Sequence, residues 1–346
     1  MKTFVLAITA VLLASAAQAQ TPSMQPIADG RQALTGNNSQ PSDWRLTPEM
    51  GFDGVARLLF QTPQGGMVCS GTLLAGGTHV LTAAHCADNF STMTVQFGVY
   101  GDVAKATRGV AQTHLHPGWT GALGMGADIA LLKLDAPVLD IQGFRISTTN
   151  DLGKNFLIMG YGTTTVGSSS VDSNWGDWGY GHWGMNTVDV LGNTFNQTIW
   201  GDPASPWGEE YIADYDGLVN GAQHNTLQMI ADIVETDAWT SGEGLGNSEA
   251  IIAGGDSGGG DFVWNGSDWL ISGVHSWGWQ ICPASWGCDI SKDNSASWGD
   301  LSGSTAVFSH AAWIQGITSA VPEPMSGLLL LAGLGLVGAV KRRRQA

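Results

Sequence analysis

Short apolar runs bounded by glycines constrain the fold of this chain more than any other feature of its sequence. They have the length of β-strands and stand at residues 55–60, 71–74, 80–82, 93–99, 129–134, 155–159 and 270–274. The 49 glycines suit the many turns that such strands need. Because the spacing of strand–helix–strand units is missing, the pattern predicts an antiparallel barrel or sandwich. The main window with a helical period is 307–317.

The balance of charge excludes one class of partner. The 346 residues include 14 Lys plus Arg against 30 Asp plus Glu, which gives a formal net charge of −16. Nucleic-acid binding needs a basic face, so no nucleic-acid partner is predicted. An apolar content of 43% with only 13% charged residues also excludes a disordered chain.

The first 19 residues have the layout of a secretory signal peptide. Lys2 supplies the positive start, residues 4–13 are apolar, and Ala17-Gln18-Ala19 is a small-x-small cleavage pattern. A first membrane span is the weaker interpretation, because the apolar run is short. We expect removal by signal peptidase and an oxidising destination, where the four cysteines would form two disulfides. Residues 20–45 are polar and are interpreted as a leader or possible propeptide.

The end of the sequence has a second targeting pattern. Pro322-Glu323-Pro324 precedes an apolar run at 325–340 and the basic cluster 341–344. In that order, residues 321–346 resemble the PEP-CTERM sorting signal of Gram-negative bacteria. The resemblance implies transient insertion into the inner membrane and removal of the tail by an exosortase-type enzyme. The mature protein is then expected in the periplasm, at the cell surface or outside the cell. A permanent transmembrane anchor is the alternative.

Three separated segments carry the residues of a hydrolytic site. They contain His85 after an apolar strand, Asp128 before another, and Ser257 within a run of glycines. A serine hydroxyl becomes a nucleophile when a neighbouring base removes its proton, and histidine suits that role near neutral pH. We therefore predict Ser257 as nucleophile, His85 as general base and acid, and Asp128 as the carboxylate that orients the imidazole. The amides of Gly255 and Ser257 are the predicted oxyanion hole.

Other chemistry is less well supported by the sequence. Residues 255–259 also satisfy the G-x-S-x-G elbow of α/β hydrolases, which would need His275 or His310 as the base and a parallel sheet with crossover helices. Residues 214–217 hint at a calcium loop, but a turn is favoured because the remaining ligand positions are not supplied. His114 and His116 lack a second pair of zinc ligands. No metal or cofactor is predicted.

Together the three segments resemble the trypsin/chymotrypsin family of serine proteases, across roughly residues 54–316. Further matches to the family are Cys69 to Leu74, His116-Pro117-Gly118-Trp119, Leu157 to Gly162, and Ser276-Trp277-Gly278. The resemblance implies two antiparallel Greek-key six-stranded β-barrels, at about 46–148 and 149–320, followed by a C-terminal helix. The active site would lie in the cleft between the barrels. It also implies a Cys69–Cys86 disulfide.

The resemblance further assigns substrate contacts. Ser276, Trp277 and Gly278 would pair with the substrate backbone, and Ser276 would also support the catalytic carboxylate. The base of the specificity pocket falls on Ile251, which cannot pair with a cation, so a preference for apolar or aromatic side chains before the scissile bond is expected.

Two family features are altered in this sequence. No cysteine stands near Ala253, and Cys282 with Cys288 suggests a small local disulfide instead. The family pairs a freed N-terminus with the acid before the nucleophile, here Asp256. Cleavage after Arg45 or after Arg31 would supply such an end; otherwise Asp256 has a different partner and needs no cut.

The sequence thus predicts an exported serine endopeptidase that hydrolyses peptide bonds through an acyl-enzyme. The alternative is a catalytically inactive relative that acts as a surface or extracellular-matrix binding protein, with its tryptophan-rich loops between residues 175 and 207 as the contact surface.

Overall fold

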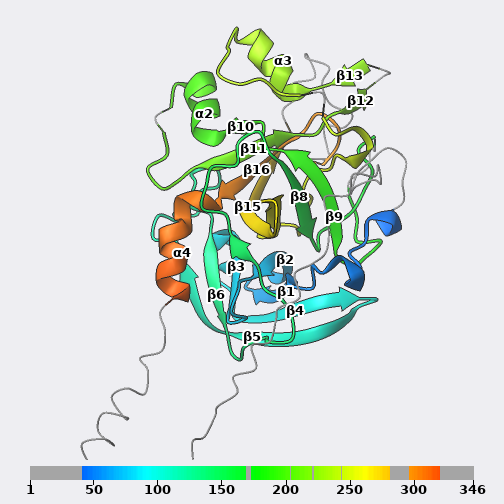
Figure 1. Ribbon diagram of the computed structural model, residues 1–346, viewed down its shortest axis with the longest axis vertical. Coiled ribbons are helices and arrows are strands. Elements are labelled where there is room, and N and C mark those ends of the chain that lie inside the picture. The colour runs from blue at the N-terminus through cyan, green and yellow to red at the C-terminus, as the bar shows by residue number, and fades with distance from the viewer. Residues whose placement is uncertain are drawn as a thin grey trace, which may run out of the picture.

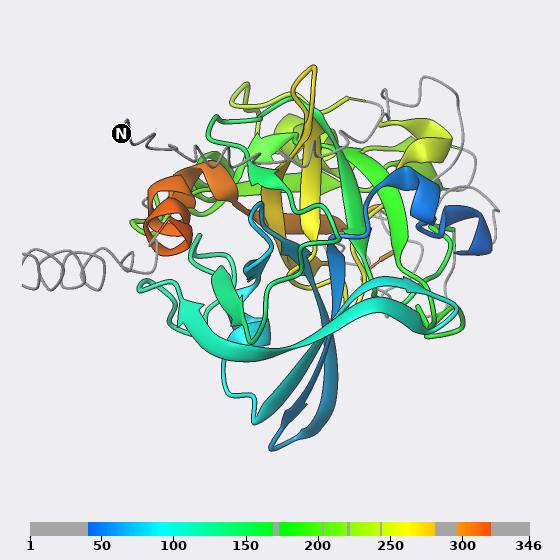
Figure 2. The same ribbon diagram turned by 60° about the horizontal axis from the view of Figure 1, so that its bottom comes forward.

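The computed structural model describes residues 41–168, 173–202, 204–219, 222–242, 244–280 and 296–319, which form two β-units packed on each other (Figure 1). The first unit is a closed antiparallel barrel with strand order β1-β2-β3-β6-β5-β4. Its strands are β1 (Val55–Thr62), β2 (Gly65–Leu73), β3 (His79–Thr82), β4 (Thr92–Tyr100), β5 (Val103–Leu115) and β6 (Ala130–Leu134). Figure 2 shows this barrel from below, with β4 and β5 in front.

Alternating side chains explain why these segments form a barrel. In β4, Met93, Val95 and Phe97 are buried while Thr92 and Thr94 are exposed, which is the two-residue period of a half-buried strand. In β6 and β3 nearly all residues are buried because further chain covers both faces. The interior joins one large apolar cluster that continues into the second unit through Phe262 and Ile271.

The second unit is an open sheet. Along the path β10-β11-β16-β15-β14-β8-β9 all pairs are antiparallel, and β7 (Arg145–Ile146) adds to β15 in parallel. Its other strands are β8 (Asn155–Gly160), β9 (His182–Thr187), β10 (Val190–Leu191), β11 (Glu210–Asp214), β14 (Gly260–Trp264), β15 (Trp269–Trp279) and β16 (Leu301–Ala306). A separate hairpin joins β12 (Gly217–Val219) to β13 (Ala222–His224).

The predicted all-β fold is confirmed, with one difference in the second unit. Where six strands were expected to close, the described residues form a half-barrel that ends at β9 and β10. Strand β10 has only two residues, because helix α2 (Gly192–Trp200) begins immediately after it. Too little extended chain is left there for the sheet to close.

Helices lie at the margins of the sheets. They are α1 (Ala84–Ala87), α2, α3 (Thr226–Ile233) and α4 (Ala311–Thr318), with single 3₁₀ turns η1 (Pro41–Trp44), η2 (Pro48–Met50), η3 (Gly246–Ser248) and η4 (Val307–His310). The helix predicted at 307–317 is confirmed as η4 and α4, which dock Val307 and Ile314 on the main apolar cluster. Among the described helices, none is long and apolar enough to cross a membrane.

The two ends of the chain bear on the predicted domain boundaries. The signal peptide, most of the leader and the sorting tail lie outside the described residues. Residues 41–45, which the sequence assigns to the leader, pack with the fold: Trp44 is buried and lies edge-on to Trp183. The expected start of the protease domain at residue 46 therefore falls inside a packed segment.

Candidate active site

Strand register brings His85 and Asp128 together. β3 and β6 are antiparallel neighbours, and Thr82 at the end of β3 lies opposite Ala130 at the start of β6. His85 follows that pair by three residues in α1, and Asp128 precedes it by two. In an antiparallel pair these two extensions leave the sheet in the same direction. The barrel itself therefore delivers an imidazole and a carboxylate to one edge.

The two side chains form a close, directed pair. Asp128 Oδ2 lies 2.7 Å from His85 Nδ1, and Asp128 Oδ1 accepts the His85 backbone N–H at 2.9 Å. The carboxylate is 1% exposed, so water does not compete for it. Held at Nδ1, the ring has Nε2 as its other nitrogen for exchange of a proton.

A third group fixes the same carboxylate from the second sheet. Ser276 Oγ donates to Asp128 Oδ2 at 2.6 Å. Strand β15 has a register shift there, because His275 pairs with Ser304 while Trp277 pairs with the adjacent Gly303. The extra residue is Ser276, and such a bulge re-aims a side chain out of the ladder. The contact expected between Ser276 and the carboxylate is present.

The loop that carries Ser257 lies against the first barrel. The Ser257 carbonyl accepts the Ser70 backbone N–H at 2.8 Å. A Cβ on Gly258 would stand 2.1 Å from Thr82 Oγ1, so only glycine allows this approach to the strand that leads to His85. Among the described residues no hydrogen bond joins Ser257 Oγ to His85 Nε2. Catalytic hydrogen bonds are often long without substrate and shorten when substrate binds.

The amides around Ser257 divide into two groups. Those of Asp256, Gly258 and Gly259 donate to Ala253, His275 and Asp256, respectively. Those of Gly255 and Ser257 donate to no group within the described chain. Gly255 has φ +97°, a conformation that L-residues rarely adopt, which turns the backbone before the serine. These two neighbouring N–H groups are the pair for which the sequence predicts an oxyanion hole.

Asp256 is held by the backbone of its own unit. Its Oδ1 accepts Gly162 N–H at 2.8 Å and its Oδ2 accepts Ala253 N–H at 2.9 Å. Burial raises the pKa of this carboxyl above its usual value, while the two amides and the nearby His275 oppose that rise. The acid therefore has two donors in the uncut chain.

Other predicted residues have varied positions. Ile251 is buried in a small cluster with Tyr215, Ala296 and Trp298. Trp277 and Gly278 follow Ser276 along β15 and are more exposed than it is. The predicted Cys69–Cys86 disulfide is present. The predicted Cys282–Cys288 bridge lies outside the described residues.

The α/β-hydrolase alternative is wrong, since all but one of the pairings in the second sheet are antiparallel. Its two candidate bases are engaged elsewhere. His275 Nε2 bonds Asp261 Oδ1 at 2.9 Å, and His310 Nε2 lies 2.7 Å from the Gly126 carbonyl.

The weaker metal candidates also have other partners. Residues 214–217 run from the end of β11 to the start of β12, and the Asp214 carboxylate accepts Leu227 N–H at the start of α3, at 2.8 Å. His116 Nδ1 accepts Gly118 N–H at 3.1 Å. Within the described residues, the one cluster of metal-ligating atoms is Cys69, His85 and Cys86, and its two sulfurs are joined in the disulfide.

Sequence reasoning missed two buried groups near the site. One is the His275–Asp261 pair behind the Ser257 loop, and the other is Glu210 at the start of β11. Each stands in a strand whose other residues are mostly buried. A charged residue inside an apolar strand was the available signal, because such a group is costly to bury without a partner or a purpose.

Comparison with known proteins agrees with this geometry. Among solved structures, the chain resembles one titled as an HL collagenase at 1.7 Å resolution, with TM-score 0.53 and 18% identity, over 80% of this chain and 98% of that chain. At that identity the likeness shows the fold, which is that of the two-barrel serine proteases.

Family models give the assignment. Residues 51–175 match the trypsin family, and residues 320–345 match the PEP-CTERM protein-sorting motif. A trypsin domain thus matches part of the chain, and a PEP-CTERM sorting motif matches its end. Family and fold support a hydrolase that binds peptide substrates, and the sorting motif implies export and exosortase processing in a Gram-negative bacterium.

Proposed function

We propose that this protein is an exported serine endopeptidase in which Ser257, His85 and Asp128 form a catalytic triad. The register of β3 and β6 carries the proposal, because it brings the buried Asp128 carboxylate to His85 Nδ1. The loop with Ser257 lies beside this pair, and two of its N–H groups have no acceptor within the described chain. A chain that had lost catalysis would have no reason to keep all of these groups in one place.

The proposed chemistry is acyl transfer in two steps. His85 Nε2 takes the Ser257 hydroxyl proton while Oγ bonds to the substrate carbonyl carbon, whose oxygen becomes negative and faces the amides of Gly255 and Ser257. The carbon–nitrogen bond then breaks, His85 returns the proton to the leaving amine, and an ester remains on Ser257. Water, deprotonated by His85, then attacks the ester carbon; the bond from that carbon to Ser257 Oγ breaks, His85 returns the proton to Oγ, and the acid is released.

The experiment compares variants of the exported protein for casein digestion and for labelling by a serine-directed phosphonate. Ser257→Ala should abolish labelling, and Ser257→Ala or His85→Ala should lower kcat by about 10⁴–10⁶-fold. Asp128→Asn should lower it by about 10⁴-fold, because the ring loses its orienting charge. The matched control is Ser267→Ala, an exposed serine in the turn before β15, which should leave both readouts unchanged.

Two outcomes would contradict this assignment. Wild-type protein that neither digests casein nor reacts with the phosphonate would favour an inactive relative. The exposed tryptophans Trp175, Trp200 and Trp207 would then suit a surface or matrix binding protein. Digestion that survives Ser257→Ala would instead place the nucleophile elsewhere.

We further propose that signal peptidase removes residues 1–19 and that an exosortase-type enzyme removes the sorting tail after transient insertion in the inner membrane. The sequence patterns support this order, and the match to the sorting motif supports the second cut. Intact mass and N-terminal sequence of the exported protein measure both cuts. A mass that retains residues 325–344 would contradict removal of the tail.

Substrate preference at the residue before the scissile bond is proposed to be apolar or aromatic. Ile251, the expected floor of that pocket, stands among Tyr215, Trp298 and Ala296, so its surroundings in the described chain are apolar. A cation placed there would lose its hydration without gaining a partner. Dominant cleavage of a peptide library after Arg or Lys would contradict this preference.

A further inference from the structure

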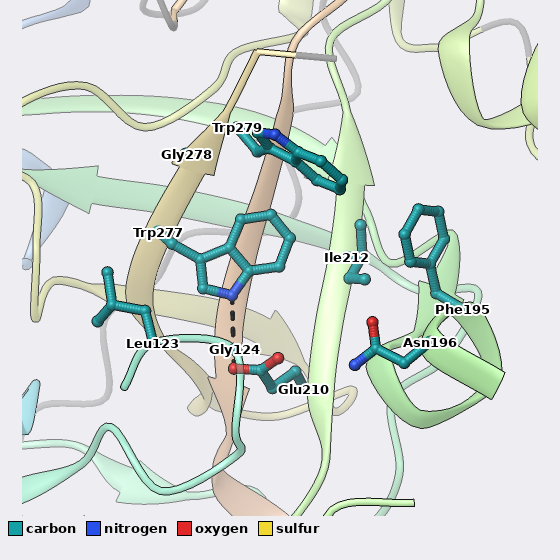
Figure 3. A pocket seen from close by; sticks show the side chains of 9 residues that line it. All are labelled: Leu123, Gly124, Phe195, Asn196, Glu210, Ile212, Trp277, Gly278 and Trp279. Carbon is teal, nitrogen blue, oxygen red and sulfur yellow. Dashed lines mark hydrogen bonds between the residues drawn. The ribbon is translucent and has the colours of Figure 1, made fainter. Parts of the chain in front are cut away.

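A pocket of about 280 Å³ lies beside the end of β15, the strand segment that is proposed to pair with the substrate backbone (Figure 3). Its walls are mainly apolar and come from Leu123, Phe195, Ile212, Trp277 and Trp279. Leu123 and Trp279 are each more than a third exposed at the rim. The pocket is shaped to hold an apolar stem.

One carboxylate stands inside this apolar surround. Glu210 is 4% exposed, and Figure 3 shows its carboxylate beneath the Trp277 ring, directed toward Gly124 and away from Asn196. Its Oε1 accepts the Trp277 indole N–H at 3.4 Å, which is a long and weak hydrogen bond. Among the ion pairs of the described residues, none involves Glu210.

The backbone packs closely on Glu210. A Cβ added to Gly192 would stand 2.9 Å from the Glu210 Cβ and 3.3 Å from its Oε2, which is too tight for a side chain there. A Cβ added to Gly124 would approach the same oxygen at 3.9 Å, an ordinary contact distance. Glycine at these two positions thus leaves the Glu210 carboxylate among the groups that line the pocket.

The pocket shares residues with the segment of β15 that is proposed to bind substrate. Trp277 and Gly278, which line it, directly follow the Ser276 that binds Asp128. A substrate backbone added to this segment of β15 would present alternate side chains to the surface that holds the pocket. These are substrate side chains upstream of the scissile bond. The residue directly before the bond is not among them, because its side chain would face Ile251.

We propose that Glu210 makes this pocket a subsite for a lysine or arginine side chain upstream of the scissile bond. The proposal rests on the proteolytic function proposed above. The aliphatic stem of either residue would lie along the apolar walls, its cationic head would pair with the Glu210 carboxylate, and the faces of Trp277 and Trp279 would add cation–π attraction. A formal charge of −16 on the protein also draws cationic peptides toward it.

Electrostatics make this preference depend on pH. Burial raises the pKa of Glu210 to about 7, opposed by hydrogen bonds from Trp277 and the Gly126 backbone and increased by the acidic neighbours Asp128 and Glu209. Asn196 from α2 faces the pocket with an uncharged amide. Above that pH the carboxylate is ionised and attracts a cation. Below it the neutral acid has no charge to offer.

The test uses peptides that share one cleavable sequence and differ at the second to fourth residues upstream of the bond, with lysine, norleucine or glutamate in turn. At pH 8 we expect kcat/KM for the best lysine peptide to exceed that of its norleucine match by about 10-fold. Glu210→Gln should bring that ratio to about 1–2. Asp140→Asn, which removes an exposed charge on the first barrel, should leave the ratio unchanged.

A second measurement needs no variant of Glu210. For wild-type protein the lysine-to-norleucine ratio should fall as pH decreases from 8 to 5.5, because lysine stays charged while Glu210 takes up a proton. Effects of pH on the catalytic steps that both peptides share act on the two alike and cancel in the ratio. A ratio near 1 at pH 8, or one that is constant with pH, would overturn the subsite.

Binding separates this inference from the function on which it rests. Calorimetry with Ser257→Ala should show tighter binding of the lysine peptide than of the norleucine peptide, and Ser257→Ala/Glu210→Gln should bind both alike. If wild-type protein cleaves nothing but the binding difference is present, the proteolytic function fails and the subsite stands. If peptides are cleaved without any lysine preference in either assay, only the subsite fails.

Discussion

The closed barrel and the open sheet are built from similar strands, yet their interiors differ in charge. Every buried carboxylate of the described chain lies after residue 149, with the exception of Asp128. The barrel interior is apolar and is closed by six strands. The open sheet and its loops instead bury Glu210, Asp214, Glu249, Asp256 and Asp261.

Most of these carboxylates replace missing strand pairing. Asp256 binds two loop amides, Asp214 binds the first turn of α3, and Glu249 accepts the Asp216 amide at 2.7 Å. A closed barrel satisfies its backbone through its ladders, whereas an open sheet with long loops needs side chains for the same purpose. The barrel thus fixes the geometry of His85 and Asp128. The second unit holds the Ser257 loop and the pocket by hydrogen bonds to buried carboxylates, which are titratable groups.

The largest expected effect concerns the buried His275–Asp261 pair. Burial alone would lower the pKa of His275, but the Asp261 charge and hydrogen bond raise it above its usual value, which favours the charged imidazolium. His275→Val or Asp261→Val leaves one charge unpaired and should reduce the free energy of unfolding by about 3–5 kcal/mol. The double variant removes both charges and should be close to wild type. Urea denaturation measures all three.

The control for this cycle is Ile271→Val, a methyl deletion in the same strand, which should cost about 0.5–1.5 kcal/mol. Losses for the two single variants that simply add in the double variant would show that the pair does not act as a unit. That result would contradict the view that buried polar contacts stabilise the second sheet while apolar packing stabilises the barrel.

The two units also differ in how much of their structure the sequence predicts. The barrel segments were predictable because alternating apolar residues and local motifs place His85 and Asp128 next to strand ends, and the family match at 51–175 covers this part. The disulfide followed from the resemblance and is confirmed. The resemblance also implied a second antiparallel β-unit, although as a closed barrel.

The half-barrel and its polar interior could not be predicted in the same way. Closure of a sheet depends on whether β10 extends past Leu191, and no local pattern reports that. Glu210 meets Trp277 across 67 residues of sequence, and His275 meets Asp261 across a hairpin. Such pairs depend on tertiary register, which composition and periodicity do not encode. The sequence also left the partner of Asp256 open, and the structure gives it two amides.

A middle-sized effect follows from acids buried near one another. Burial first, and then the charges of Asp214 and Glu249, raise the pKa of Asp189 to about 9, and burial raises that of Glu249 to about 8. Between their ordinary values and these raised values, the folded state binds more protons than the unfolded state. Stability should therefore fall as pH rises, by at most about 1.4 kcal/mol per pH unit for each group.

The window from pH 7 to pH 9 contains this effect, and the raised pKa of His275 acts in the same direction there. His116 and His310 have pKa values lowered by burial, so their contribution to stability is lost only as pH falls toward and below their ordinary value. Thermal unfolding of wild type should show a decreasing Tm across the window, and Asp189→Asn should flatten that slope. A Tm that rises from pH 7 to pH 9 would show that these acids are ionised at little cost.

The smallest expected effect tests whether activity requires cleavage after Arg45, between the leader and the protease domain. Arg45 donates to Asp177 through Nε at 2.8 Å and lies 3.7 Å over the Tyr180 ring. Leu46, which would become the new N-terminus, is 3% exposed, and its N–H already binds the Gly181 carbonyl at 2.7 Å. The site therefore stands assembled in the uncut chain.

Arg45→Gln should consequently leave kcat/KM for casein peptides within about 2-fold and lower stability by only about 0–1 kcal/mol, because a partly exposed ion pair contributes little. N-terminal sequencing of active wild-type protein should find a start upstream of Pro41, whether at Gln20 or after a cut at Arg31. A start at Leu46, together with an inactive Arg45→Gln variant, would contradict this. It would mean that Asp256 exchanges its two amide donors for a new N-terminus. The buried polar contacts of the second sheet would then form only after cleavage and would not be a property of the uncut fold.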